Sequence, residues 1–339
     1  MKLVLAALLL GGSLGVSLAG DTNQPSYFKD GTFSFIEEND LVVNTDRHYT
    51  QGLKLSYMMS RLPGWLDALS DKVGYWGGSR DDDHQRWGLV IGQNIYTPGD
   101  ISVATPLPDD RPYAGWLYTG LALHRYGHAG ERFGTLESFE LNLGIIGPGS
   151  LAGQAQTWVH EIRGFGLPQG WDHQLKTEPG VQMKYTRQWL CRFASGSGFA
   201  IDFIPYFGAS LGNISTAAHI GSTVRIGYNL PDDYGPQTID SLLTSDLGKP
   251  EAQCFYGLGC YGFASLEGKA VGYSAFLDGN LFRDGPEVKK EPFVADLRVG
   301  VALTSRHFEF AFQMDMRSAE FTKQNEANAF GSFTASLKF

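Results

Sequence analysis

The chain has 339 residues, of which 13% are aromatic and 43 are glycine, and it carries a formal net charge of −9. This acidic balance argues against nucleic acid as a partner, because binding to phosphates requires basic patches. The mean hydropathy of −0.17 is too low for a helical membrane protein. Beyond the N-terminal segment, no run of roughly 18 uncharged apolar residues is present to form a membrane-spanning helix.

The N-terminal segment predicts export. Lys2 supplies a positive charge, and the apolar run that follows it ends in the small-residue sequence S-L-A at positions 17–19. This pattern is typical of a cleaved secretory signal peptide, and the apolar run is short for a membrane anchor. We therefore expect residues 1–19 to be a signal peptide and residues 20–339 to form one β-barrel domain.

Apolar and polar residues alternate in many segments of the chain. The alternation is clearest near the C-terminus, where one face carries Phe308, Phe310, Phe312, Met314 and Met316, and the other carries Glu309, Gln313, Asp315 and Arg317. Successive side chains point to opposite faces of a strand. A soluble sheet could also alternate, but a face of three Phe and two Met indicates contact with lipid.

The same pattern predicts about twelve strands, an even number as a single-chain bacterial barrel requires. They cover residues 31–39, 48–60, 86–96, 113–125, 133–146, 177–190, 198–209, 213–229, 258–280, 292–304, 306–319 and 327–339. The segment 258–280 could instead be two strands. The last segment, which is apolar on one face and ends in Phe339, is typical of the closing strand of an outer-membrane barrel. The expected fold is an all-β, antiparallel transmembrane β-barrel.

One segment departs from this rhythm. Residues 150–163 predict a short helix in the loop after the fifth strand. Ser150 is the expected N-cap, and Gly164 is expected to end the helix. Gln156 and His160 share one face of it, at positions i and i+4.

If both chain ends lie in the periplasm, several unusual polar clusters meet at the outer rim of the barrel. These clusters are E-N-D at 38–40, Y-T-Q-G at 49–52, Q-N-I-Y at 93–96, D-R-P-Y at 110–113, the 150–163 helix, and F-L-D-G-N at 276–280. Their convergence predicts a site that faces the outer leaflet. Two turns at the other end, 60–86 and 230–257, would be long, whereas periplasmic turns are usually short.

Taken together, these motifs resemble the outer-membrane lipid A 3′-O-deacylase family. The motifs are E-N-D, D-R-x-Y-T-x-G, Q-N-I-Y-T-P, D-D-R-P-Y-A-G-W, G-I-I-G-P, Q-x-W-V-H, G-W-D-x-Q and F-L-D-G-N. Each motif alone is weak, but the ordered set is specific and runs through nearly the whole mature chain. The resemblance implies a bacterial outer-membrane barrel of twelve strands. It also implies hydrolysis of the 3′-acyloxyacyl ester of lipid A with a calcium ion and a histidine base.

The resemblance assigns roles to five residues. His160 would be the general base that deprotonates water, a task that suits an imidazole because it titrates near neutral pH. Asn39 and Asp40 match the family's essential pair, and their oxygens suit Ca²⁺. The ion would polarise the ester carbonyl and stabilise the oxyanion. Thr50 and Gln156 match other active-site positions and would position the substrate or the base.

Several of these residues also have a structural interpretation. A histidine in a loop helix is most often simply exposed, Asn39-Asp40 could be a turn signal, and Thr50 could be a plain strand residue. Arg111 could bind a lipid phosphate, which a guanidinium matches bidentately, or pair with a carboxylate at the rim. Some family members carry Glu six residues after the histidine, where this chain has Gly166, which removes a candidate substrate or calcium contact.

Three functional hypotheses follow. The first is an esterase that acts on lipid A, the second is a phospholipase-type acyl hydrolase that acts on another lipid, and the third is a non-enzymatic barrel with a pore or structural role. A serine hydrolase is disfavoured, because no serine is convincingly partnered with His160. The G-x-S-x-G matches at residues 11–15 and 208–212 lie in the predicted signal peptide and between two predicted strands, not at a turn from a strand into a helix. The expected partners are lipid A or lipopolysaccharide and outer-membrane lipids, and the expected oligomeric state is a monomer.

Overall fold

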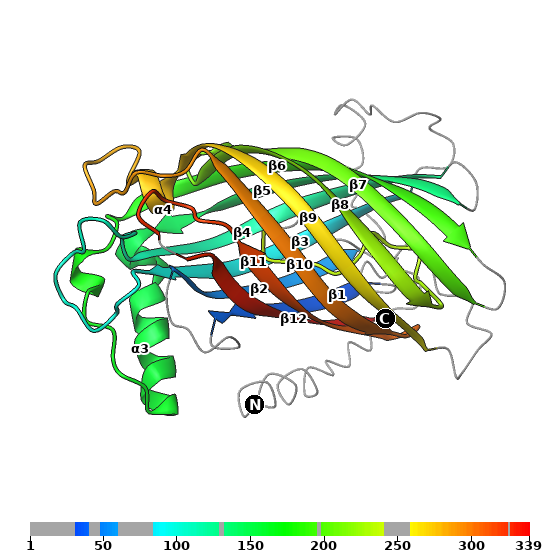
Figure 1. Ribbon diagram of the computed structural model, residues 1–339, viewed down its shortest axis with the longest axis horizontal. Helices are drawn as coiled ribbons and strands as arrows, with labels where there is room; N and C mark the ends of the chain where they lie inside the picture. Colours follow the sequence, from blue (N-terminus) through cyan, green and yellow to red (C-terminus); the bar gives the residue numbers. More distant parts are fainter. Residues whose placement is uncertain are drawn as a thin grey trace, which may run out of the picture.

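The computed structural model describes residues 31–40, 48–59, 84–128, 132–194, 198–240, 258–324 and 326–339, so the predicted signal peptide lies outside the described residues. Within them, twelve strands form a closed antiparallel barrel in which each strand pairs with its neighbours in sequence and β12 pairs with β1 (Figure 1). The strands are β1 (Thr32–Asn39), β2 (His48–Met59), β3 (His84–Thr97), β4 (Ala114–His128), β5 (Phe133–Ile146), β6 (Glu178–Ala194), β7 (Phe199–Gly212), β8 (Ser215–Tyr228), β9 (Gly259–Ser274), β10 (Phe293–Thr304), β11 (Phe308–Arg317) and β12 (Asn328–Lys338). The predicted fold class is confirmed.

The helices that the structure describes are short and lie between strands. The connection from β5 to β6 contains η3 (Gly147–Ser150), α3 (Ala152–Arg163) and η4 (Trp171–His173), and β9 is followed by α4 (Ala275–Asp278). The segment predicted over 258–280 is therefore one strand and a helical turn, not two strands. Across the described ranges, no helix combines the length and the apolar character needed to cross a bilayer.

Large apolar side chains cover the outside of the barrel, as the alternation predicts. In β11, Phe310, Phe312 and Met316 are exposed, whereas Glu309 and Gln313 on the other face are buried. An apolar outer band with a polar interior is the arrangement of barrels that stand in a lipid bilayer. The outer face of the wall is therefore the surface that meets lipid.

The lumen is lined with charged side chains that pair with one another across strands. Lys54 of β2 and Glu140 of β5 lie 3.4 Å apart, and both side chains are fully buried. Arg225 of β8 donates to Asp202 of β7 at 2.6 Å, and both are again fully buried. Breaking a buried ion pair costs about 3–5 kcal/mol. This pairing is what makes a polar lumen compatible with a stable barrel.

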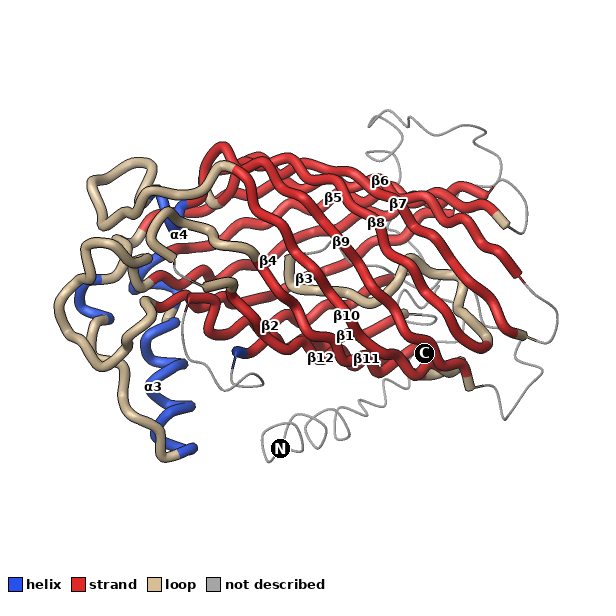
Figure 2. Tube along the Cα trace, in the orientation of Figure 1, coloured by secondary structure: helices blue, strands red, loops and turns tan. Residues whose placement is uncertain are grey.

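Residues 229–240, which follow β8, fold back into the lumen, and we call them the inner segment. Figure 2 shows this loop running inside the barrel wall. Lys184 of β6 donates to the carbonyl of Asp240 at 3.2 Å, and Thr334 of β12 donates to the carbonyl of Gln237 at 3.1 Å. Since β6 and β12 lie on opposite sides of the ring, the segment spans the lumen. The connection after β8 is long because part of it fills the barrel.

The two ends of the barrel differ. Both α3 and α4 lie at one end, which we call the α3 end, and the C-terminus lies at the other (Figure 1). Because neighbouring strands are antiparallel, β1, β3 and β5 end at the α3 end, and β2, β4 and β6 begin there. The polar clusters that end or begin these strands therefore converge at one end, as predicted.

We expect Asp233→Ala to lower the free energy of unfolding by about 3 kcal/mol, because it breaks a buried ion pair. Asp233 belongs to the inner segment and pairs with the fully buried guanidinium of Arg225. Urea unfolding in detergent, followed by tryptophan fluorescence, measures the change.

The adjacent Asp232 provides a matched control. Its side chain is 59% exposed and pairs with Arg192, so Asp232→Ala is expected to cost less than about 1 kcal/mol. Equal losses in the two variants would show that the Asp233 pair does not anchor the inner segment.

Candidate functional site

The connection after β5 packs α3 against the outer face of the barrel wall. Gln93 of β3 donates to the carbonyl of Ser150 at 2.7 Å, and a Cβ on Gly115 of β4 would overlap Ser150 Oγ. Gln93 has the strand parity of the exposed Ile91, and Gly115 has that of the exposed Leu121. Both residues therefore face outward, and α3 begins at a place where only glycine leaves room.

The N-terminus of α3 differs from the sequence prediction. Ser150 is not the N-cap: this position is Leu151, which has a left-handed φ of 59° and makes no side-chain cap hydrogen bond. The Ser150 hydroxyl donates instead to the carbonyl of Gly147 at 2.6 Å, so it closes the η3 turn before the helix begins. At the other end, Gly164 terminates the helix with a φ of 70°, as predicted.

His160 lies on the buried face of α3 and is oriented by a backbone carbonyl. The residue is only 3% exposed, and its Nδ1 lies 2.6 Å from the carbonyl oxygen of Gly166. A carbonyl oxygen can only accept, so Nδ1 carries a proton, and Nε2 is the acceptor nitrogen of the neutral ring. His160 is thus not an exposed loop histidine. Gly166, which stands where some family members have Glu, contributes its carbonyl to the site.

Gln156 lies one turn before His160 on the same face and is 2% exposed. Its Oε1 accepts a hydrogen bond of 2.8 Å from Nε1 of Trp171, the first residue of η4. The sequence alone did not identify Trp171 as a site residue. The sequence signal that could have found it is its place in the G-W-D-x-Q motif. The spacing of residues along the chain does not predict that an indole would be the partner of Gln156.

Asn39, Asp40 and Thr50 lie on the adjoining ends of β1 and β2. Asn39 is paired with Gln51 in the register of these strands, and Asp40 is fully buried directly after β1. The β2–β3 register shifts next to Gln51, which makes Thr50 the extra residue of a bulge. Its Oγ1 lies 2.7 Å from Oγ1 of Thr97. Because bulges redirect a side chain, Thr50 is not a plain strand residue.

The predicted catalytic residues therefore form two groups at the α3 end. Asn39, Asp40 and Thr50 are placed by β1 and β2, whereas Gln156 and His160 are placed by α3, which packs on β3 and β4. Since β2 and β3 are neighbours in the barrel, the strand ends of the first group adjoin the strands that carry the helix.

The Arg111 side chain does not join either of these two groups. It is 1% exposed, and its Nη1 donates to Glu320 Oε2 at 3.1 Å. Its guanidinium also stacks over the ring of Tyr96, 4.7 Å from the centroid. The pairing with a carboxylate at the rim, one of the two interpretations of Arg111, is thus present in the structure, and Arg111 lines the lumen rather than the surface beneath α3.

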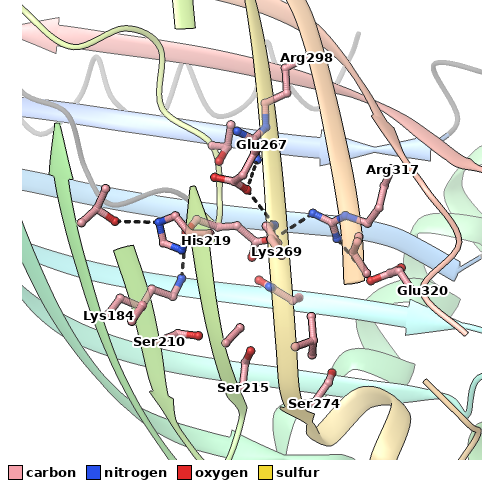
Figure 3. Close-up of a pocket in the computed structure, with 18 of the residues that line it drawn as sticks. Lys184, Ser210, Ser215, His219, Glu267, Lys269, Ser274, Arg298, Arg317 and Glu320 are labelled. Atoms are coloured by element: carbon pink, nitrogen blue, oxygen red, sulfur yellow. Dashed lines mark hydrogen bonds and ion pairs between the residues drawn. The ribbon is translucent and has the colours of Figure 1, made fainter. Parts of the chain in front are cut away.

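A cavity of about 230 Å³ lies inside the lumen (Figure 3). Glu267 in its wall accepts from Arg298 at 3.1 Å and lies 3.2 Å from the ammonium of Lys269. Lys269 also pairs with Asp296 at 2.8 Å. These charges neutralise one another, so the cavity is part of the polar core that supports the barrel. It is separate from the predicted catalytic residues, which lie at the α3 end.

The oxygen donors at the end of β1 have the chemistry that calcium requires. The side chains of Asn39 and Asp40 offer amide and carboxylate oxygens, which are hard ligands, and backbone carbonyls and water commonly complete such a site. In the described part of the chain, no group of three or more His, Cys, Asp or Glu side chains is arranged to hold a metal ion.

Comparisons with known proteins bear on the fold and the family of the chain. A family profile described as outer membrane protein LpxR matches residues 3–339. The fold is similar to the structure of LpxR from Salmonella typhimurium, with 20% identity, a TM-score of 0.69, and coverage of 91% of this chain and 100% of that chain. At this identity the structural similarity establishes a shared fold.

Other matches are more distant. The β domain of the Bordetella autotransporter BrkA is 9% identical, with a TM-score of 0.44 and coverage of 91% of this chain and 98% of that chain. The translocator domain of the autotransporter NalP from Neisseria meningitidis is 9% identical, with a TM-score of 0.45 and coverage of 99% and 95%. A search of curated protein sequences gives no match.

We expect Gly115→Ala to displace α3 from the wall, because the new methyl group would overlap Ser150 Oγ. Overpacking of this kind costs about 1–3 kcal/mol, here in docking of the helix rather than in barrel stability. Limited proteolysis of residues 147–163 should become several-fold faster. Gly268→Ala is the control, since a methyl group there would meet no described atom within 4 Å. Unchanged cleavage in Gly115→Ala would contradict close docking at this position.

Proposed function

Because the chain belongs to the family of outer-membrane proteins described as LpxR, we propose that it is a lipid A deacylase that hydrolyses the 3′-acyloxyacyl ester. The observation that carries the proposal is the His160 imidazole, which is buried on a helix packed against the outer face of the barrel and oriented by the Gly166 carbonyl. With the α3 end at the outer leaflet, a base at this position would lie beside the ester groups of the lipids in that leaflet. The proposal places the α3 end at the outer leaflet of the bacterial outer membrane.

In the proposed reaction, His160 is the general base. Its Nδ1 proton is held by the Gly166 carbonyl, so Nε2 accepts a proton from water while the water oxygen attacks the ester carbonyl carbon. Nε2 then returns this proton to the sugar oxygen as the bond between that oxygen and the acyl carbon breaks. The products are the free acyl chain and a lipid A hydroxyl.

Asn39 and Asp40 would hold a calcium ion. Their oxygens match the ligand preference of Ca²⁺, and Asp40 is fully buried. When bound, the ion would supply positive charge that stabilises the developing oxyanion. Thr50, redirected by its bulge, and Gln156, on the face of α3 that carries His160, would position the ester.

The other two hypotheses have less support. A pore requires an open lumen, whereas the inner segment spans it between β6 and β12. A phospholipase-type acyl hydrolase would use the same base and water, so the identity of the substrate distinguishes it. Mass spectrometry of lipid A and of phospholipids from one cell extract makes this distinction directly.

We expect His160→Ala to leave a folded barrel whose deacylation rate falls by about 10²–10⁴-fold, because the general base is lost. The measurement is the mass spectrum of lipid A from cells that express each form: the wild type should remove the 3′ acyl chains, and the variant should retain them. His173→Ala, at an exposed position in η4, serves as the control and should keep full activity. Continued removal of these chains by His160→Ala would exclude His160 as the base.

We expect chelation by EGTA to suppress the activity and calcium to restore it. Magnesium should restore it poorly, because Mg²⁺ demands a smaller, octahedral site. Asp40→Asn should raise the calcium concentration needed for half-maximal rate. Asp109→Asn, whose carboxylate is 63% exposed, should leave this concentration unchanged. Full activity of the wild type in EGTA would remove calcium from the proposal.

A further inference from the structure

We infer that Trp171 is a positioning residue for this reaction: its indole N–H fixes the side-chain amide of Gln156 so that Nε2 donates a hydrogen bond to the carbonyl oxygen of the substrate ester. The inference rests on the proposed function and extends it to a residue outside the predicted catalytic set. The contact joins η4 to α3, two elements of the connection after β5.

The hydrogen bond settles which way the Gln156 amide points. An indole N–H can only donate, so its partner at 2.8 Å must be the amide oxygen, Oε1. The amino group, Nε2, then points away from Trp171. It is buried, and it has no hydrogen-bond partner among the residues that the structure describes. A buried donor without a partner is costly, and a substrate oxygen that accepts from Nε2 removes this cost when the ester binds.

The position of Nε2 suits a contact with the ester. Gln156 and His160 share the buried face of α3, one turn apart. A donor placed one turn from the base can reach the carbonyl oxygen of an ester whose carbonyl carbon is attacked by the water that His160 activates. The chain thus provides one acceptor, Nε2 of His160, and one donor, Nε2 of Gln156, on a single rigid element.

The indole of Trp171 is itself held firmly. A Cβ on Gly153 of α3 would come within 3.0 Å of the indole ring, so the helix touches it directly. The ring of Tyr113 packs on it with centroids 4.9 Å apart, and the Tyr113 hydroxyl donates to the carbonyl of Ile101 at 3.2 Å. A donor clamped between the helix and Tyr113 can fix the amide, whereas a mobile one could not.

Loss of the indole N–H would allow the Gln156 amide to rotate by half a turn. Oε1 would then face the substrate carbonyl oxygen, and two acceptors would oppose each other where the oxyanion develops. The donor matters most when charge builds on that oxygen, so the loss should appear in kcat rather than in KM.

The test is a double-mutant cycle on the full-length protein in mixed micelles of detergent and lipid A. Trp171→Phe keeps an aromatic ring and removes the N–H, and we expect kcat to fall about tenfold with KM unchanged. In a Gln156→Ala background, Trp171→Phe should cause no further fall, because no amide is left to orient. Trp158→Phe, the same change at a 54% exposed position of α3, should match the wild type.

The outcomes separate this inference from the proposed function. If the wild type releases no acyl chain from lipid A, the proposed function fails and the inference falls with it. If the wild type is active and Trp171→Phe has no effect, or lowers kcat equally with and without Gln156, the positioning role alone is overturned.

A second readout does not alter Trp171 and remains valid if Trp171→Phe fails to fold. The chain has 7 tryptophans, and their indole N–H groups give separate signals in a ¹⁵N–¹H spectrum. Gln156→Ala should move the Trp171 signal toward the position of an indole without a carbonyl acceptor and leave the Trp158 signal in place. An unmoved Trp171 signal would overturn the inference.

Discussion

The structure depends on one constraint: backbone polar groups that stand in hydrocarbon must find hydrogen-bond partners within the chain. The chain meets it by pairing β1 with β12, in register from Thr32 opposite Lys338 to Asn39 opposite Gly331. Closure leaves no free strand edge and decides which side chains meet lipid. It also means that an element added to the outer face needs partners for its polar groups within the chain, as the Ser150 carbonyl finds in Gln93 and the His160 ring finds in the Gly166 carbonyl.

Inside the barrel, charged side chains rather than apolar ones have to be stabilised. Charged side chains such as Lys54 and Glu140 have no access to bulk water and are stable because each has a partner on another strand. The inner segment adds backbone carbonyls, at Gln237 and Asp240, that accept from the walls. The lumen therefore serves as the structural core of this barrel, and the candidate active site lies on the wall at the α3 end.

The alternation in β11 predicted the fold because a strand in lipid has only two environments, and Phe310 and Gln313 can each occupy only one. The i, i+4 spacing predicted the shared face of Gln156 and His160 for the same local reason. The prediction that Ser150 is the N-cap was wrong, because its hydroxyl donates to the Gly147 carbonyl in the turn before the helix. The contact of Trp171 with Gln156 and the path of the inner segment arise from tertiary packing, which leaves no periodic trace in the sequence.

The inner segment limits the route by which a lipid could reach the candidate active site. Because this loop crosses the lumen, a molecule as large as a lipid cannot pass through the barrel. A lipid substrate would therefore approach by lateral diffusion within the membrane, and its products would leave in the same way. Encounter then becomes a search in two dimensions. Turnover would follow the crowding and fluidity of one leaflet rather than any concentration in the surrounding water.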